Sequence, residues 1–355
     1  MSSVQRVMEH WSSQAQLGQE TAVVVPVYFS AKPSDATVER LLRITLMDCR
    51  HYLPPEQVWA VVDGDARSAA ILARVADELA ADAGGGIRIM VLPENRGKLG
   101  ALRAAMAAIL REQPHVRWLA VMDGDADHMI AVLPRLTRAA FFLAEVYGHD
   151  LVLAIGARAS RTQPMGWVRG ELERLLDGLT LEACSHALAR EGRALDLSQC
   201  LGVATPDLSS GFKVYGRGLA ERLFDGPEPN YATLSPRDCM RYGPETVTIV
   251  EMILAGGIMG EVLRPTWDGQ PATSFGEFGV VEMYGELLAW VWARLDIPTL
   301  AAAQMYDNWQ RRIALGTTSQ GVELVRRVRS HALGRLAEWQ GQESPPAARP
   351  ILPFT

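Results

Sequence analysis

Two aspartates separated by one glycine, Asp123 and Asp125, have the types and spacing best suited to chemistry in this sequence. The apolar run before them, residues 118–122, is typical of a buried strand that ends in a turn. Side chains at i and i+2 of an extended segment point the same way, so both carboxylates can face one cation. Because Mg²⁺ and Mn²⁺ prefer carboxylate oxygen and complete their shell with phosphate, we predict Mg²⁺ or Mn²⁺ here. Asp127 and His128 are expected to be solvated turn residues.

A second acidic pair, Asp63 and Asp65, follows another apolar run. A carboxylate at a strand end can accept the ring N–H of uracil, or the N1–H and amino group of guanine, in a charge-assisted hydrogen bond. The alternative is a helix cap, which is the usual role of a single aspartate after a strand.

A third cluster, residues 93–103, combines Asn95, Gly97 and Gly100 with the basic residues Lys98 and Arg103. A glycine-rich helix start with a lysine suits contacts with phosphate or with a base. The P-loop pattern G-x-x-x-x-G-K-[ST] is absent from the sequence, and a glycine turn with solvated basic residues is the alternative.

A parallel sheet would bring these three clusters together. Single helical patterns separate the apolar runs of the first half and require parallel crossovers, so we predict an α/β fold with helices on both faces of the sheet. Ligands bind outside the carboxyl ends of such strands, where all three clusters fall. The predicted strands are residues 21–29, 57–65, 87–95, 116–127 and 150–158.

The second half is less regular. Its patterns predict a long helix over residues 165–191, a strand that enters a helix near residue 213, a helix that begins near residue 245 and stops at Gly256, and a strand over residues 257–267. Helices dominate from about residue 278 to residue 339.

Composition narrows the classes of partner. The 355 residues carry 35 basic and 41 acidic side chains, a net charge of −6, without a basic block, which argues against a nucleic-acid partner. The four cysteines are scattered, so neither a zinc site nor a disulfide framework is indicated, and we predict a cytoplasmic protein.

Residues 1–20 do not have the pattern of a signal peptide. The apolar stretch 287–295 is too short to span a membrane and predicts an amphipathic helix, with a peripheral membrane contact as the alternative.

The order of these segments resembles the family-2 glycosyltransferases of the GT-A fold, and within them the polyprenyl-phosphate hexosyltransferase-like branch. The resemblance covers about residues 21–265 and rests on "VVVPVYF", "VVDGD", "ENRGKLGALRAAM", "MDGDADH", "IGAR" and "DLSSGFKVYGR". It implies a GT-A mixed sheet with a C-terminal helical extension. It also implies a nucleoside-diphosphate sugar donor, UDP slightly favoured over GDP, and a small soluble or lipid-linked acceptor.

The resemblance also implies roles for individual residues. Asp63 would contact the nucleobase, with Asp65 as a helper; Asp123 would lie near the ribose and the metal, and Asp125 would be the main metal ligand. The other implied nucleotide-sugar contacts are Pro26, Asn95, Lys98, Arg103 and Gly124.

The resemblance further implies a catalytic base near the start of a helix that ends in Ala-Gly. Counting back from Gly256, Glu245 stands where inverting members carry the aspartate of a Glu-Asp pair, and Pro244 replaces the glutamate. A carboxylate there can deprotonate an acceptor hydroxyl; the alternative is that Glu245 favours the positive end of its own helix. The loop that holds Arg264, Trp267 and Asp268 is the predicted acceptor contact.

The predicted domains are an N-terminal extension (1–20), a GT-A catalytic domain (21–270), a C-terminal helical extension (271–340) and a Pro-rich tail (341–355). The catalytic domain divides into a nucleotide-sugar half (21–160) and an acceptor half (161–270). A homodimer is compatible with the sequence.

Other functions stay open. A retaining glycosyltransferase is the nearest alternative, disfavoured because no histidine stands between His186 and His331 as a late metal ligand. A sugar-1-phosphate nucleotidyltransferase needs a glycine-rich loop after the first strand, and none is present. The G-x-G-x-x-G pattern of a dinucleotide oxidoreductase is also missing. A non-catalytic nucleotide-sugar binder is compatible with the sequence.

Overall fold

The computed structural model describes residues 5, 14–83, 85–163, 165–202, 205–266, 279–343 and 345–348. The strands are β1 (Thr21–Val27), β2 (Val58–Val62), β3 (Arg88–Val91), β4 (Trp118–Val121), β5 (Val152–Arg158), β6 (Lys213–Gly216) and β7 (Ile258–Arg264). The α-helices are α2 (Gln14–Glu20), α3 (Asp35–Cys49), α4 (Ala66–Ala83), α5 (Gly97–Glu112), α6 (Leu133–Tyr147), α7 (Trp167–Arg190), α8 (Arg217–Ala220), α9 (Pro236–Leu254), α10 (Val280–Arg294), α11 (Thr299–Trp309) and α12 (Ser319–Trp339). Short helical turns are η1 (Pro55–Gln57), η2 (Ile130–Val132), η3 (Glu221–Asp225) and η4 (Ala314–Thr317).

The described strands form one mixed sheet in the order β3-β2-β1-β4-β6-β5-β7. Neighbouring strands are parallel, except that β6 runs antiparallel to both β4 and β5. The predicted α/β class and the mixed sheet are confirmed, and all five strands predicted in the first half are present. The antiparallel β6 lies between β4 and β5 and thereby joins the two halves of the sequence in one sheet.

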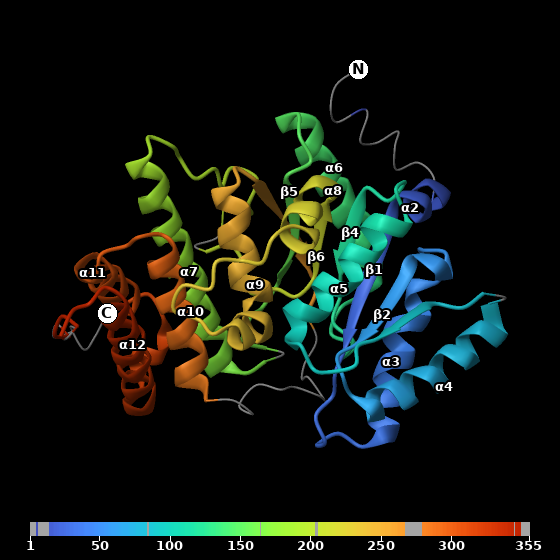
Figure 1. Cartoon of the computed structure of the whole chain (residues 1–355), viewed down its shortest axis with the longest axis horizontal. Helices are drawn as coiled ribbons and strands as arrows, with labels where there is room; N and C mark the ends of the chain where they lie inside the picture. Colours follow the sequence, from blue (N-terminus) through green and yellow to red (C-terminus); the bar gives the residue numbers. More distant parts are fainter. Residues whose placement is uncertain are drawn as a thin grey trace.

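Helices cover both faces of the sheet, because alternate residues of its strands are apolar on both sides (Figure 1). Val23 and Val25 of β1 belong to a core shared with α3, α4 and α6. Ala22 and Val24 belong to a second core shared with α5, α7 and α9. Helices therefore cover both faces of the sheet, and a ligand site can form only at the ends of the strands.

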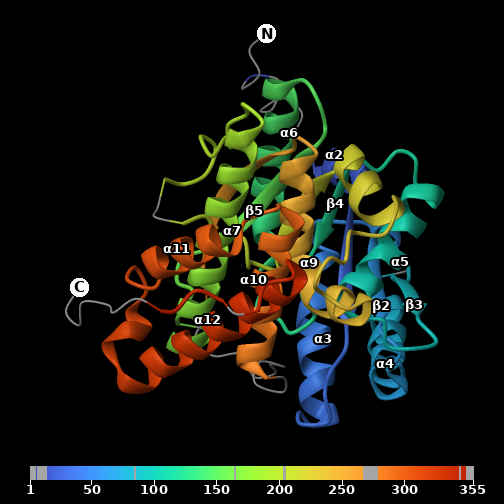
Figure 2. The same ribbon diagram turned by 60° about the vertical axis from the view of Figure 1, so that its left-hand side comes forward.

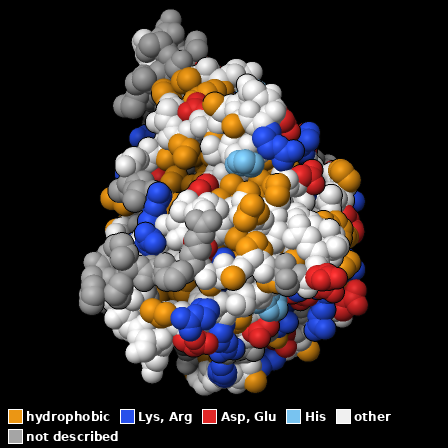
Figure 3. Space-filling model, turned by 90° about the vertical axis from the view of Figure 1, so that its left-hand side faces the viewer, with side chains coloured by type: hydrophobic (Ala, Val, Ile, Leu, Met, Phe, Trp, Pro, Cys, Tyr) orange, Lys and Arg blue, Asp and Glu red, His pale blue; other side chains and the backbone are white. Residues whose placement is uncertain are grey.

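The C-terminal helices α10, α11 and α12 pack at one end of the molecule beside α7 (Figure 2). Trp309 of α11 packs closely against Gly178 of α7, where a Cβ would stand 2.2 Å from the indole ring. A buried ion pair, Arg329 Nε to Asp307 Oδ1 at 2.7 Å, joins α12 to α11. The surface on this side mixes basic, acidic and apolar side chains (Figure 3).

Helix α10 differs from the amphipathic helix predicted for residues 287–295. Trp290 and Trp292 are both fully buried, and every residue from Leu287 to Ala293 is buried. Because both indole side chains are buried within the protein, they do not contact a membrane surface in this fold. Within the described ranges, no helix combines the length and apolarity needed to cross a lipid bilayer.

Candidate active site

A cleft of about 1330 Å³ opens at the carboxyl ends of the strands. This volume exceeds the range of about 300–1,000 Å³ that is common for one small-molecule ligand, so two substrates can share it. Of the predicted site residues, those that line the cleft are Pro26, Asp63, Asp65, Asn95, Lys98, Arg103, Asp123, Gly124, Asp125, Glu245 and Arg264. Trp267 and Asp268, predicted as acceptor contacts, lie outside the described residues.

The acidic turn after β4, residues 123–128, is held by hydrogen bonds between its own residues. The backbone N–H of Asp123 donates to His128 Nδ1 at 3.0 Å, and the N–H of Asp127 donates to Asp125 Oδ1 at 3.2 Å. His128 stacks on Phe212, and its pKa lies well below the ordinary value because of burial and the nearby Arg264. The prediction that Asp127 and His128 are solvated is wrong, since both are buried. A neutral His128 fixes the direction of the turn.

The carboxylates of this turn are electrostatically unequal. Burial and then the negative charges of Asp123 and Asp127 raise the pKa of Asp125 to about 7. The pKa of Asp123 lies below its usual range: burial raises it, but the ammonium of Lys98 lowers it by more. The three carboxylates of the turn therefore repel one another, and this repulsion contributes to the raised pKa of Asp125.

The chemistry of these donors fits a divalent cation. Across the described ranges, no group of three or more His, Cys, Asp or Glu side chains could hold a metal ion. Mg²⁺ is usually bound by one or two carboxylates together with substrate phosphates, and Asp123 and Asp125 supply that number. A cation there would also relieve the repulsion that raises the pKa of Asp125.

Lys98 joins the acidic turn to Glu245. Its Nζ donates to Glu245 Oε1 at 2.7 Å and lies 2.8 Å from Asp123 Oδ1. Burial lowers the pKa of Lys98, but the two carboxylates outweigh burial and leave the pKa above its ordinary value. The side chains of all three residues remain 25–30% exposed to the cleft. One ammonium thus bridges the strand end at β4 and helix α9.

Glu245 does not lie at the start of its helix. Helix α9 begins at Pro236, after the N-cap Ser235, and Glu245 lies well inside it. The alternative in which Glu245 favours a helix N-terminus is therefore wrong. The helix also contains Pro244, which has no N–H to donate to the carbonyl of Met240 one turn earlier.

Gly97 brings α5 against this part of α9. It adopts φ +80°, and a Cβ on it would stand 2.6 Å from the carbonyl oxygen of Met240. Only glycine combines this backbone conformation with such a close approach. The contact places the first turn of α5, and with it Lys98, directly beside Glu245.

Asp63 organises the neighbouring strand end. Its Oδ1 accepts the N–H of Arg96 at 2.7 Å, and Asn95 Nδ2 donates to its carbonyl oxygen at 3.3 Å. Burial raises the pKa of Asp63, while the N–H of Arg96 lowers it. Asp65 Oδ2 accepts the N–H of Ser68 at 2.8 Å, which is the capping role given above as the alternative.

Two arginines that were predicted to contact the substrates, Arg103 and Arg264, make hydrogen bonds within the protein. The guanidinium of Arg103 donates to the carbonyls of Leu223 and Gly226 at 2.7 and 2.8 Å. Arg264 is buried and donates to Asp127 Oδ2 at 3.4 Å and to the carbonyl of Gly156 at 3.1 Å. These two arginines therefore link segments of the protein that surround the cleft.

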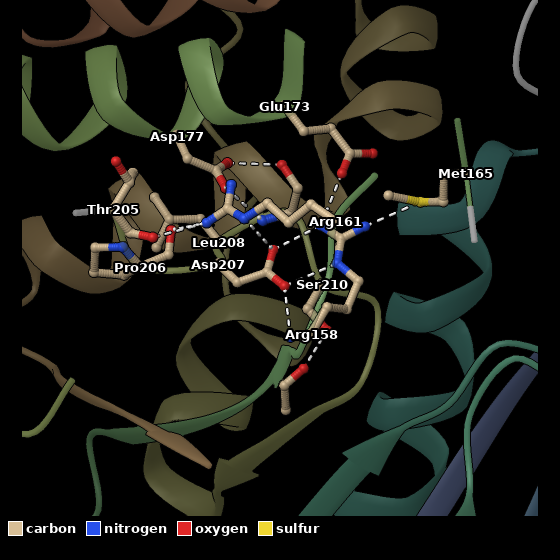
Figure 4. A network of polar contacts seen from close by, with 12 residues as sticks. Arg158, Arg161, Met165, Glu173, Asp177, Thr205, Pro206, Asp207, Leu208 and Ser210 are labelled. Atoms are coloured by element: carbon tan, nitrogen blue, oxygen red, sulfur yellow. Dashed lines mark hydrogen bonds and ion pairs between the residues drawn. The ribbon is translucent and has the colours of Figure 1, made fainter. Parts of the chain in front are cut away.

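Figure 4 shows a buried ionic network that is absent from the prediction, and two of its residues, Arg158 and Glu173, also line the cleft. Arg158, at the end of β5, donates to Asp207 Oδ1 at 2.6 Å and to Glu173 Oε2 of α7 at 2.7 Å. Arg161 pairs with Asp177 at 2.7 Å. A signal was present in the sequence: Glu173 and Asp177 are carboxylates four residues apart on a helix with many apolar residues, and buried carboxylates need partners.

Two comparisons with known proteins found a match, one in sequence and one in structure. Residues 22–224 match the sequence profile of "Glycosyl transferase family 2". Among solved structures, the chain is similar to the crystal structure of S. aureus TarS 1-349, with 10% sequence identity, a TM-score of 0.36, and coverage of 91% of this chain and 92% of that one. No curated protein matches the chain in sequence.

Proposed function

The chain belongs to glycosyl transferase family 2, and from this premise we propose that it moves a hexose from a nucleoside-diphosphate sugar to an acceptor hydroxyl with inversion at the anomeric carbon. The observation that carries the proposal is that the ammonium of Lys98 lies within 2.8 Å of both Asp123 and Glu245 in one cleft. A donor-side carboxylate and a candidate base are thereby held side by side.

The donor is proposed to lie over the ends of β1, β2 and β4. Asp63 is the nucleobase contact, because its carboxylate lines the cleft beside Asn95 and Arg96. UDP is slightly favoured over GDP. The N-terminus of α5 and Lys98 offer positive charge for the diphosphate, as helix N-termini do for anions generally.

Asp123 and Asp125 are the residues that would hold Mg²⁺ or Mn²⁺. When bound, such an ion neutralises negative charge on the departing diphosphate. The chain itself orients this end of the donor through the turn that His128 and Arg264 fix.

Glu245 is proposed as the general base that takes the proton of the acceptor hydroxyl. It faces the cleft from α9, between the donor strands and the network around Arg158. The acceptor therefore enters from the side of α7, α9 and α10. The sequence resemblance favours the polyprenyl-phosphate hexosyltransferase-like branch, and both a small soluble and a lipid-linked acceptor are compatible with this entry.

A thermal-shift screen of nucleotide sugars, with and without Mn²⁺, tests the donor half of the proposal. Bound ligand stabilises the folded state in proportion to its saturation, so a UDP- or GDP-sugar is expected to raise the melting temperature only with the metal. Equal melting temperatures for every nucleotide sugar would contradict the proposal. Proton NMR of the fresh product's anomeric centre separates inversion from retention.

A further inference from the structure

The contact between Lys98 and Glu245 poses a chemical conflict for the proposed base. A carboxylate oxygen that already accepts a hydrogen bond from an ammonium has less accepting capacity left for the hydrogen of an acceptor hydroxyl. Lys98 Nζ lies 2.7 Å from Glu245 Oε1, which is direct, charge-assisted contact. The arrangement that positions Glu245 therefore also restrains it.

The surroundings of Lys98 offer another partner for the ammonium. Lys98 belongs to the first turn of α5, where backbone N–H groups point out of the helix. The same turn lines the cleft beside Asp63 and Asp123, on the proposed path of the diphosphate. A diphosphate there competes with Glu245 for the same ammonium.

We propose that Lys98 is a positioning residue that couples the two substrates: it holds Glu245 in the empty enzyme and passes to the donor's diphosphate when the donor binds. The exchange releases Glu245 as a proton acceptor only when a donor is present. This inference rests on the proposed function and adds to it an order of events, donor first and base second.

The backbone supports such an exchange without a large movement. Gly97 is fixed against Met240 of α9, so the Cα positions of Lys98 and Glu245 stay close while the lysine side chain turns. The Lys98 side chain is 28% exposed and has four rotatable side-chain bonds. Asp123 remains within its reach in both positions, since the donor site adjoins that carboxylate.

The coupling can be measured without knowing the acceptor, by titrating UDP and GDP into the protein at constant Mg²⁺ in a calorimeter. If Lys98 must leave Glu245 to bind a diphosphate, then Glu245→Gln should tighten binding of the preferred nucleotide about 3- to 10-fold, a coupling in the lower range for contacting residues. Lys98→Met should weaken binding. In the Lys98→Met background, Glu245→Gln should have no effect, because there is no ammonium to release.

The matched control is Glu251→Gln, the same substitution on the same helix, where Glu251 pairs with Arg294 at 2.6 Å and does not line the cleft. It should leave nucleotide affinity unchanged. Glu245→Ala removes the carboxylate with a different shape and should give the same tightening, which guards against a local packing effect of Gln.

Three results would overturn the coupling. Unchanged affinity in both Glu245 variants shows that Lys98 does not leave Glu245. Equal tightening with and without Lys98 shows simple repulsion between Glu245 and the diphosphate. If neither UDP nor GDP binds the wild-type protein, the proposed function fails and this inference falls with it.

Discussion

The two sides of the cleft are built in different ways. On the donor side, Asp63 and Asp123 lie within two residues of a strand end, and sheet pairing fixes their positions. On the acceptor side, Glu245 and Glu173 project from helices α9 and α7, and their positions depend on packing between distant segments. The difference shows that the donor side is determined locally and the acceptor side by the whole fold. Lys98 joins them, because its ammonium contacts both Asp123 and Glu245.

The largest expected effect is on the acceptor side, from breaking its buried network. Arg158→Met leaves Asp207 and Glu173 buried without their guanidinium and should lower the free energy of unfolding by about 3–5 kcal/mol. Urea unfolding measures it. The control Arg326→Met removes an exposed pair with Glu323 and should cost less than about 1 kcal/mol. Similar costs for both variants would show that the acceptor side is not a rigid wall.

The next effect separates catalysis from binding. Glu245→Gln keeps the size of the side chain but removes its basicity, and should lower turnover by ~10²-fold or more, as expected of a general base. The measurement is nucleotide release from the preferred donor under saturating conditions. Glu251→Gln on the same helix should turn over normally. Normal turnover of Glu245→Gln would reduce Glu245 to a structural partner of Lys98.

The contact between the two sides is tested at Gly97. Gly97→Ala places a Cβ 2.6 Å from the carbonyl of Met240 at φ +80°, which should cost about 1–3 kcal/mol of stability and lower turnover. Gly86→Ala is the control, because a Cβ at Gly86 meets nothing within 4 Å. Thermal unfolding of both variants compares them. If Gly97→Ala is as stable and active as Gly86→Ala, the approach of α5 to α9 does not position the site.

The smallest expected effect is at the base contact. Asp63→Asn keeps an oxygen that can accept the N–H of Arg96 but loses the charge, and should weaken UDP or GDP binding by about 10-fold. Binding of inorganic pyrophosphate should not change, because it has no base. Equal weakening of both ligands would place Asp63 in the general electrostatics of the cleft rather than at the nucleobase.

The strands and the donor carboxylates could be predicted from the sequence because local patterns of apolar and acidic residues encode both. The apolar runs before Asp63 and Asp123 predict strands, and parallel crossovers predict that their ends meet. The start of α9 was placed too late, because Gly243 and Pro244 read as a helix boundary, although Ser235 and Pro236 carry a start signal. The pairing of Lys98 with Glu245 spans 147 residues, and no local pattern encodes it.

Other features needed the fold itself. The surroundings of His128 include Phe212, from the segment before β6, and Arg264, from the end of β7. The network of Arg158, Glu173 and Asp207 joins a strand end, a helix and a loop that are separated in sequence.

The most direct test of the central claim is calorimetric titration of UDP and GDP, with and without Mn²⁺, into the wild-type protein and Asp125→Ala. The account predicts that the wild-type protein binds the preferred nucleotide more tightly with Mn²⁺ and that Asp125→Ala loses this metal dependence. If the variant keeps wild-type Mn²⁺-dependent affinity, the metal and donor site is not built around Asp123 and Asp125.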